Sequence, residues 1–297
     1  MNTRVLSLSL LLSLTMSWQA AFAEREIHEA ADVHPQGEIE ISNVSGRIEV
    51  EGWDKERVEV TGTLAREAER LEFRTQGRHT LIRVEHPSGK RHVGSSELRI
   101  RMPLESRLVI ASVAADIIVR EVHGAQRLHS VSGDIDTVMF GDDVQLKTVS
   151  GDITLSATGK PGLLTLTTVS GDAELRGVAG EVVLQTVSGD LRVESDQIER
   201  ARIRTTNGDA VLRSGLAPDA RIEMEAVNGT LTLLLKGEAD AEYTLETFNG
   251  RIDNAFGPEP VRTSRFAPGT ELRFTTGEGS ARVNMETLNG AIILRTD

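Results

Sequence analysis

The most informative absence in this chain of 297 residues is cysteine, of which there is none. Without cysteine there can be no disulfide framework and no lipid attached to an N-terminal cysteine. Beyond its N-terminal stretch the chain also lacks any apolar run approaching the length of a membrane span, so we expect no span in the mature chain. The fold must therefore be stabilised by its core alone.

Aromatic side chains and positive charge are also scarce. Aromatics make up 3% of the residues, and the formal net charge is −12. Few aromatic rings leave little surface on which sugars could stack. Phosphate binding needs clustered Lys and Arg, so this composition argues against nucleic acid and anionic membranes as partners. The hydrophobic fraction of 39% is nevertheless sufficient for a core.

The N-terminal stretch MNTRVLSLSLLLSLTMSWQAAFA, residues 1–23, predicts a secretory signal peptide. Arg4 supplies the positive charge, residues 5–16 form an apolar run too short to span a bilayer, and residues 21–23 give a small-x-small cleavage pattern. We expect the mature chain to begin at Glu24. Export to the periplasm is the leading expectation, with the cell surface or the medium as alternatives.

The chain is rich in one repeat, seen in LKTVSGDITL, LTTVSGDAEL and LQTVSGDLRV. Aligned on the glycine of Ser-Gly or Asn-Gly, for which Ala115 substitutes once, consecutive frames fall at Ala115, Gly133, Gly151, Gly171, Gly189, Gly208, Gly229 and Gly250. A period of about 20 residues predicts a stacked repeat architecture. The last step, from Gly250 to Gly290, is twice as long and is interpreted as two periods with a degraded frame between them.

Aliphatic residues recur at fixed distances from the glycine, with polar residues between them. In the frame of Gly151, Leu146 and Ile153 occupy two of these columns. Such alternation predicts β-strands with one buried face. The parity changes once, so a corner at Val-Ser-Gly must join two strands that share one core. We expect glycine there because it tolerates positive φ, with Thr148 and Val149 wedging the bend.

Two short strands and two turns per repeat predict an all-β, single-chain β-solenoid (β-helix) of coils of about 20 residues. A meander of antiparallel hairpins is the alternative. Residues 24–105 fit the period poorly, so we expect them to form an irregular, β-rich N-terminal cap before a solenoid of residues 106–297. Residues 254–270, rich in Pro and Gly, are either a plain insertion or a binding loop.

One aspartate follows the glycine in successive frames, which raises the question of a cation site. The candidates are Asp134, Asp152, Asp172, Asp190 and Asp209. Carboxylates one coil apart, at about 4.8 Å, repel by about 0.9 kcal/mol in water, so they must face solvent, share protons or bind cations. Weak calcium binding is one hypothesis, although calcium needs six to eight oxygens. The other is a turn aspartate that accepts backbone hydrogen bonds. No other cofactor is expected.

Catalytic patterns are missing. The serines that precede the repeat glycine have no histidine near them in sequence, and the G-x-S-x-G, P-loop and Rossmann patterns do not occur. None of the seven histidines forms an HxH or HExxH pattern. We therefore predict no catalytic residue. A carboxylate pair on a strand face, as solenoid enzymes use on polysaccharides, is the enzymatic alternative.

The repeated TVSGDI and TxNGxI strands, the stretch EGWDKERVEVTG and the signal peptide resemble the bacterial "putative adhesin" domain family, a family of unknown function. The resemblance extends from about Gly37 to Asp297. It implies an exported β-solenoid of adhesin-like character, and it carries no catalytic residues to transfer.

These observations predict a non-enzymatic exported protein of the cell envelope that serves as a binding or structural module. Its partner is expected to be an envelope protein or a glycan. An enzyme acting on an envelope or extracellular polysaccharide and a cation-stabilised repeat scaffold are the alternatives.

Overall fold

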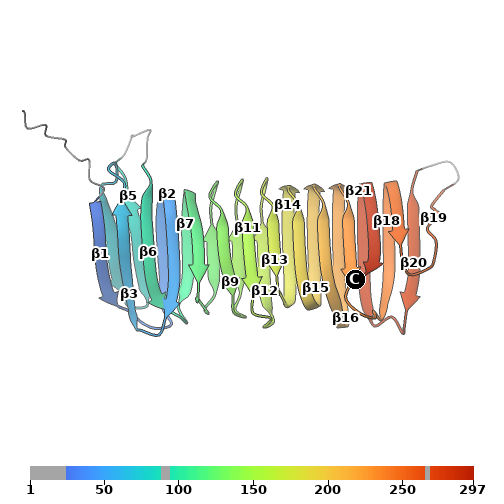
Figure 1. Ribbon diagram of the computed structural model, residues 1–297, viewed down its shortest axis with the longest axis horizontal. Helices are drawn as coiled ribbons and strands as arrows, with labels where there is room; N and C mark the ends of the chain where they lie inside the picture. The colour runs from blue at the N-terminus through green and yellow to red at the C-terminus, as the bar shows by residue number, and fades with distance from the viewer. Residues whose placement is uncertain (1–24, 88–93, 265–267) are drawn as a thin grey trace, which may run out of the picture.

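The computed structural model describes residues 25–87, 94–264 and 268–297, so the predicted signal peptide lies outside the described residues. In this described part the chain consists of strands and turns without a helix, which confirms the predicted all-β class. The strands lie side by side across the long axis of a rod (Figure 1).

The strands follow one another along the chain in three groups. The N-terminal group is β1 (Arg25–Asp32), β2 (Glu38–Trp53), β3 (Arg57–Leu64), β4 (Arg70–Gln76), β5 (His79–Glu85) and β6 (Ser96–Pro103). The middle group is β7 (Arg107–Arg120), β8 (Gln126–His129), β9 (Ile135–Met139), β10 (Val144–Lys147), β11 (Ile153–Ala157), β12 (Gly162–Thr167), β13 (Ala173–Arg176) and β14 (Gly180–Ser188). The C-terminal group is β15 (Leu191–Asn207), β16 (Ala210–Asn228), β17 (Leu231–Leu235), β18 (Ala241–Asn254), β19 (Val261–Arg262), β20 (Thr270–Thr276) and β21 (Ala281–Thr296).

The repeats stack in parallel and in register. Leu128 pairs with Leu146, and Leu146 with Leu166, so each residue lies beside its equivalent one repeat later. We call this series of strands before the corner the first ladder. The strands after the corner form a second ladder, in which Ile135 pairs with Ile153 in the same way. Parallel pairing in these repeats rules out the antiparallel meander there.

The aliphatic columns of both ladders are buried, as predicted. Leu146, Ile153 and Leu155 have at most 1% of their surface exposed. The two ladders therefore share one core, which runs along the rod. Because the backbone of each repeat is hydrogen-bonded to its neighbours, the stability of a repeat depends on the repeats beside it.

Thr137 stands where most frames have an aliphatic residue, and the structure accounts for this polar position. Its side chain is fully buried, and its hydroxyl donates to Gln126 Oε1 at 2.5 Å. The Gln126 amide in turn donates to the carbonyl oxygens of Val122 and Val138 at 3.1 and 2.8 Å. The polar pair is thus satisfied inside the core, as burial requires.

The corner glycine is required by the close approach of the repeat before it. A Cβ atom on Gly171 would lie 1.9 Å from the carbonyl oxygen of Gly151, and one on Gly229 would lie 2.0 Å from that of Gly208. The expectation of a positive φ is confirmed at Gly208, Gly229 and Gly290, where φ is 152°, 159° and 155°. It is wrong at Gly133, Gly151, Gly171, Gly189 and Gly250, which are absent from the residues with positive φ. At this second group the stacking distance alone excludes a side chain.

At the N-terminal end, the order of the strands along the rod differs from their order in the sequence. One side of β2 pairs in parallel with β7, and the other side pairs with β5 and β6. The antiparallel pairs β1–β3, β3–β6 and β4–β5 complete this end. Figure 1 shows β2 between β6 and β7. The predicted division of the chain at residue 105 stays a prediction.

The C-terminal end has the same feature. β21 lies between β16 and β18 in the first ladder, because it pairs in parallel with both (Figure 1). In the second ladder it also pairs with β17. After β16 and β17 the chain therefore leaves one strand position in the stack empty and forms β18 beyond it. It then adds β20 antiparallel to β18 and returns as β21, which occupies the empty position. The prediction of a degraded repeat between Gly250 and Gly290 is wrong, because β19 and β20 form an antiparallel extension there.

Candidate functional site: the corner edge

The predicted aspartates form a hydrogen-bonded ladder along the corner edge. The backbone N–H of Asp152 donates to Asp134 Oδ1 at 2.9 Å, and that of Asp172 donates to Asp152 Oδ1 at 2.9 Å. The same bond joins Asp190 to Asp172 and Asp209 to Asp190, each at 2.8 Å. Each carboxylate thus binds the backbone of the next repeat, which ties neighbouring repeats together.

The five aspartates are exposed and lie in a row rather than around a point. Within the described ranges, no group of three or more His, Cys, Asp or Glu side chains is arranged to hold a metal ion. Calcium binding by Asp134, Asp152, Asp172, Asp190 and Asp209 stays a prediction.

A column of threonines, three residues before the glycine, is buried, but the hydroxyls of these threonines differ in their hydrogen bonds. The hydroxyls of Thr148 and Thr168 accept the backbone N–H groups of Gly151 and Gly171, at 3.0 and 3.1 Å. The hydroxyls of Thr186 and Thr205 are buried and have no hydrogen-bond partner in the described part of the chain.

The reason is a change in the corner itself. From Gly189 onward, the glycine N–H bonds to the next repeat: Gly189 to the carbonyl oxygen of Asn207 at 3.2 Å, and Gly208 to that of Asn228 at 3.1 Å. The threonine hydroxyl of the same corner then loses its donor. One repeat later, from Asn207 onward, asparagine replaces serine at the corner, and the asparagine side chains form their own ladder. Asn228 Nδ2 donates to Asn207 Oδ1, and Asn289 Nδ2 to Asn228 Oδ1, each at 2.8 Å.

The main surface feature of this edge is apolar and was not predicted from the sequence. The residue two positions before the glycine faces outward in the stacked repeats, so Val149 does not wedge the bend but is 40% exposed. Of the ten large hydrophobic residues that are exposed in the described part, eight belong to this column. In spatial order they are Val113, Val131, Val149, Val169, Val187, Val227, Leu288 and Phe248, with Thr206 between Val187 and Val227.

We call this column the corner ridge. Its eight steps of one repeat each, at about 4.8 Å, give a length of about 38 Å. Scattered exposed apolar residues are normal on a protein surface, whereas a continuous apolar strip indicates an interaction site. The one usable signal in the sequence was the valine that recurs at this position.

At its C-terminal end the corner ridge becomes one wall of a groove of about 580 Å³. Val227, Leu288 and Phe248 lie on one side, and Glu225, Glu286 and Glu246 line it as well. The threonine column lies along its base, and Thr263, Gly269 and Thr270 border it at the end of the rod. The loop predicted as either insertion or binding excursion therefore contributes residues to this groove.

A second cavity, of about 380 Å³, lies on the outward face of the second ladder near the N-terminal end. Its charges are used in ion pairs between neighbouring strands. Arg99 Nε lies 3.2 Å from Glu49 Oε2, and Arg101 Nε lies 3.3 Å from Glu51 Oε2. Because these Arg and Glu side chains pair with each other, their charges are not available to bind a ligand in this cavity.

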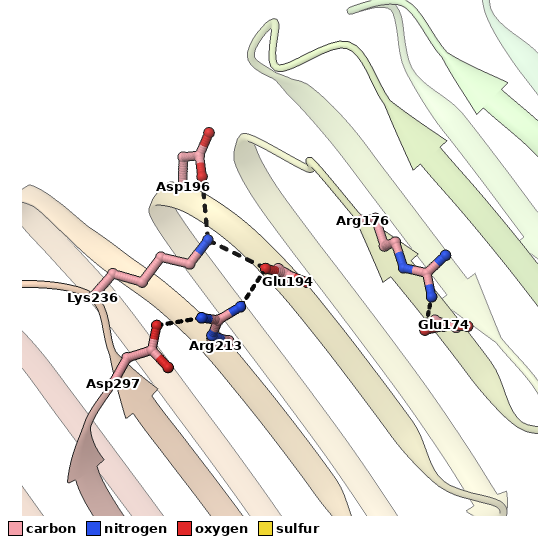
Figure 2. Close-up of polar contacts among 7 residues, drawn as sticks. All are labelled: Glu174, Arg176, Glu194, Asp196, Arg213, Lys236 and Asp297. Carbon is pink, nitrogen blue, oxygen red and sulfur yellow. Dashed lines mark hydrogen bonds and ion pairs between the residues drawn. The ribbon is translucent and has the colours of Figure 1, made fainter.

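The outward face of the second ladder also carries a charged network near the C-terminus (Figure 2). Arg213 contacts Glu194 Oε1 at 2.7 Å and Asp297 Oδ2 at 2.5 Å, and Lys236 Nζ lies 3.5 Å from Glu194 and 3.2 Å from Asp196. The hydrogen bond from Arg213 lowers the pKa of Asp297. These exposed pairs join β15 and β16 to the residues directly after β17 and β21, and such pairs contribute little to stability individually.

The described residues pair no hydroxyl nucleophile with a histidine base. Among the described residues, no serine or threonine hydroxyl is hydrogen-bonded to a histidine, and His28 and His79 face glutamates instead, at 3.2 Å each. No helix in the described part is long and apolar enough to cross a membrane.

The fold and the corner edge define a class: an all-β repeat protein with a parallel stack and an apolar ridge along one edge. The family described as Toastrack DUF4097 matches residues 29–176, from β1 to the end of β13. The chain is thus similar to a domain family of unknown function over a segment that ends before the Asn-Gly corners.

A similar fold is found among solved structures. A crystal structure from Parabacteroides distasonis ATCC 8503, described as a "Putative lipid binding protein", has a TM-score of 0.52 at 12% identity and covers 92% of this chain and 96% of its own. A "putative adhesin" from Bacteroides fragilis NCTC 9343 has a TM-score of 0.41 at 10% identity, covering 93% of this chain and 98% of its own. A search of curated proteins found no match.

Proposed function

We propose that this chain is an exported β-solenoid that works as a non-enzymatic, adhesin-like binding module of the cell envelope, with the corner edge as its binding surface. The observation that carries the proposal is the concentration of exposed apolar side chains in one column. A core-forming repeat has no structural need for an apolar residue at an outward position, because polar residues fit the same strand.

The remaining features agree with this assignment. The stretch at residues 1–23 directs export, with the periplasm as the first expected destination. A rigid rod with in-register repeats presents a long surface to an extended partner, as stacked repeat proteins do. The partner is an envelope protein or a glycan.

Co-sedimentation with envelopes of the producing cells tests the proposal. Purified residues 25–297 are compared with a ridge variant, Val149→Asp with Val169→Asp, and with a control variant, Thr154→Asp with Ser156→Asp. The control adds the same charge at exposed positions of β11 in the second ladder. We expect the wild type and the control to sediment with the envelopes and the ridge variant to remain in solution.

Two results would contradict the proposal. One is a wild-type chain that does not sediment with protein-containing or glycan-containing envelope fractions. The other is release of soluble saccharides from the envelope during incubation, which would favour the polysaccharide-cleaving alternative.

A further inference from the structure

We propose that the groove and the corner ridge bind a basic, amphipathic segment of a partner polypeptide, one in which Lys or Arg stands beside apolar residues. This inference rests on the proposed function and names the partner's chemistry. Its apolar part is recognised by the ridge: Val227, Leu288 and Phe248 are 41%, 47% and 49% exposed where they line the groove.

Three carboxylates supply the charge complementarity. Glu225 pairs in register with Glu286, and Glu286 with Glu246, so the three side chains stand on neighbouring strands of the first ladder. Like charges directly opposite each other destabilise a sheet. Arg204 Nη2 lies 2.9 Å from Glu225 Oε1, and Arg273 Nη2 lies 2.9 Å from Glu246 Oε1. Glu286, between them, has no ion pair within the part that the structure describes.

A cationic side chain in the groove would therefore relieve a repulsion that the chain leaves in place. The three glutamates do not form a metal-binding group within the described ranges, so the matching charge is one spread along a polymer. The partner's own positive groups would face this row while its apolar groups contact Leu288 and Phe248.

The base of the groove adds unused hydrogen-bonding capacity. Thr186 and Thr205 border the groove and are 2% and 5% exposed, and their hydroxyl oxygens have no partner in the described residues. A buried polar atom without a hydrogen-bond partner is uncommon in folded proteins and indicates a place where a ligand or solvent group binds. A rotation about χ1 exchanges the hydroxyl and methyl positions of threonine and would turn the oxygen toward the groove.

The rest of the edge has the same character. Asp134, Asp152, Asp172 and Asp190 run beside the corner ridge, exposed and without an ion pair to a described Lys, Arg or His. Carboxylates on the flank repel phosphate groups and would oppose the same surface of a second copy. A basic polypeptide is the occupant that satisfies both the apolar strip and its acidic flank.

Fluorescence anisotropy with labelled peptides tests the inference on residues 25–297. The probe is a dodecapeptide of alternating Leu and Lys, and the two matched peptides replace Lys by Glu or Leu by Ser. We expect the Leu-Lys peptide to bind, with an affinity that falls as salt is added, and neither matched peptide to bind comparably.

Variants locate the binding. Phe248→Ala should weaken the Leu-Lys peptide by about tenfold, because an aromatic anchor in a groove carries much of the binding energy. Glu286→Gln should weaken it by about threefold at low salt, through lost charge attraction. Glu97→Gln is the matched control, since it removes one exposed carboxylate on β6, away from the groove, and should leave the affinity unchanged.

The outcomes separate the inference from the proposed function. Equal binding of the Leu-Glu or Ser-Lys peptide overturns the inference, and so does binding that Phe248→Ala and Glu286→Gln leave intact. If no basic peptide binds while co-sedimentation with envelopes still depends on the corner ridge, the inference falls and the binding module stands. Preferential binding to anionic lipid vesicles, or dimerisation that the ridge variant abolishes, would likewise overturn it.

Discussion

The repeats with Ser-Gly corners and the repeats with Asn-Gly corners share a core but differ in how the corner is hydrogen-bonded. In the first region, represented by Thr168 and Gly171, the glycine N–H is satisfied inside its own repeat. In the second region, represented by Gly208, the N–H bonds to the next repeat, and asparagine side chains join the repeats as well. The switch begins at Gly189, which follows Ser188 but stacks on the first Asn-Gly repeat. The corner's bonds thus run between repeats wherever an Asn-Gly repeat comes next.

The surface changes with the corner. The Ser-Gly region carries all but the last residue of the aspartate ladder, whereas the Asn-Gly region carries the row of glutamates and most of the groove. The matched family segment ends at residue 176, so the groove lies in the part of the chain outside it. The corner ridge thus runs through both regions, and the second region adds the groove and its glutamates to that ridge.

The largest expected effect is common to both regions. It tests whether the distance between stacked repeats is what requires glycine at the corner. Gly171→Ala and Gly250→Ala should each lower the free energy of unfolding by about 3 kcal/mol, because the new Cβ meets a backbone oxygen at 1.9 or 1.7 Å. Gly237→Ala is the control: it has open space but a φ of 79°, so it should cost about 1 kcal/mol. Urea unfolding measures all three, and equal costs would contradict the stacking explanation.

The next effect differs in sign between a corner whose glycine N–H bonds within its own repeat, at Gly171, and one whose glycine N–H bonds to the next repeat, at Gly189. Thr168→Val should cost about 1–3 kcal/mol, because it leaves the buried N–H of Gly171 without an acceptor. Thr186→Val should be neutral or stabilising, because the hydroxyl it removes has no partner in the described residues.

The two threonines are equally buried, each 2% exposed, so burial cannot explain a difference between them. Chemical denaturation of the two variants gives the comparison directly. Similar losses of stability in both variants would show that the two ways of bonding the corner glycine do not differ as described.

A smaller effect concerns the asparagine ladder. Asn228→Ala should cost about 1 kcal/mol, because Asn228 donates to Asn207 and accepts from Asn289. Ser170→Ala, at the same place in a Ser-Gly corner, should change stability by less than about 0.5 kcal/mol. Thermal unfolding of both variants measures the difference, and a costlier Ser170→Ala would reverse the comparison.

The smallest effect is a pH dependence confined to the second region. Asp240 Oδ1 accepts the N–H groups of Gly279 at 2.5 Å and Ser280 at 3.3 Å, and these bonds, that from Gly279 first, lower the pKa of Asp240 below its usual 3.8. A lowered folded-state pKa contributes stability above the unfolded-state value, and this contribution is lost as the pH falls through the folded-state value.

The wild type should therefore be more stable than Asp240→Ala near neutral pH, and the gap should narrow below about pH 4. Glu238→Ala, an exposed neighbour, serves as the control and should show no such narrowing. Denaturation midpoints at several pH values measure the gap. A constant gap from neutral to acid pH would contradict the role of the carboxylate.

Period-2 alternation was enough to predict the strands and the buried columns, because a residue such as Leu146 is fixed to one face by its neighbours. The same pattern could not place Val149, since parity changes at the corner and either side was available. The same pattern also could not predict the backbone geometry at Gly151. The carbonyl that excludes a Cβ belongs to another repeat, and only the stacking distance shows it.

The order of strands at the ends of the rod could not be predicted for a different reason. The frames of Gly229, Gly250 and Gly290 have nearly the same residues, so each would stack on either of the others. The sequence therefore contains no local sign that β21 lies between β16 and β18. The groove depends on this order, because it brings Leu288 between Val227 and Phe248.

Disulfide trapping is the most direct test of this strand order. The chain has no cysteine of its own, so only the two introduced cysteines can form a disulfide. Asn228 and Asn289 are register partners on adjacent strands, about 4.8 Å apart, whereas Asn228 and Asn249 are two levels, or about 9.6 Å, apart. Cysteine pairs more than about 7 Å apart do not bridge without backbone movement. Mild oxidation should therefore cross-link Asn228→Cys with Asn289→Cys and leave Asn228→Cys with Asn249→Cys reduced. Cross-linking of the second pair in place of the first would show that β18 stacks directly on β16, and would contradict both the fold order and the groove built on it.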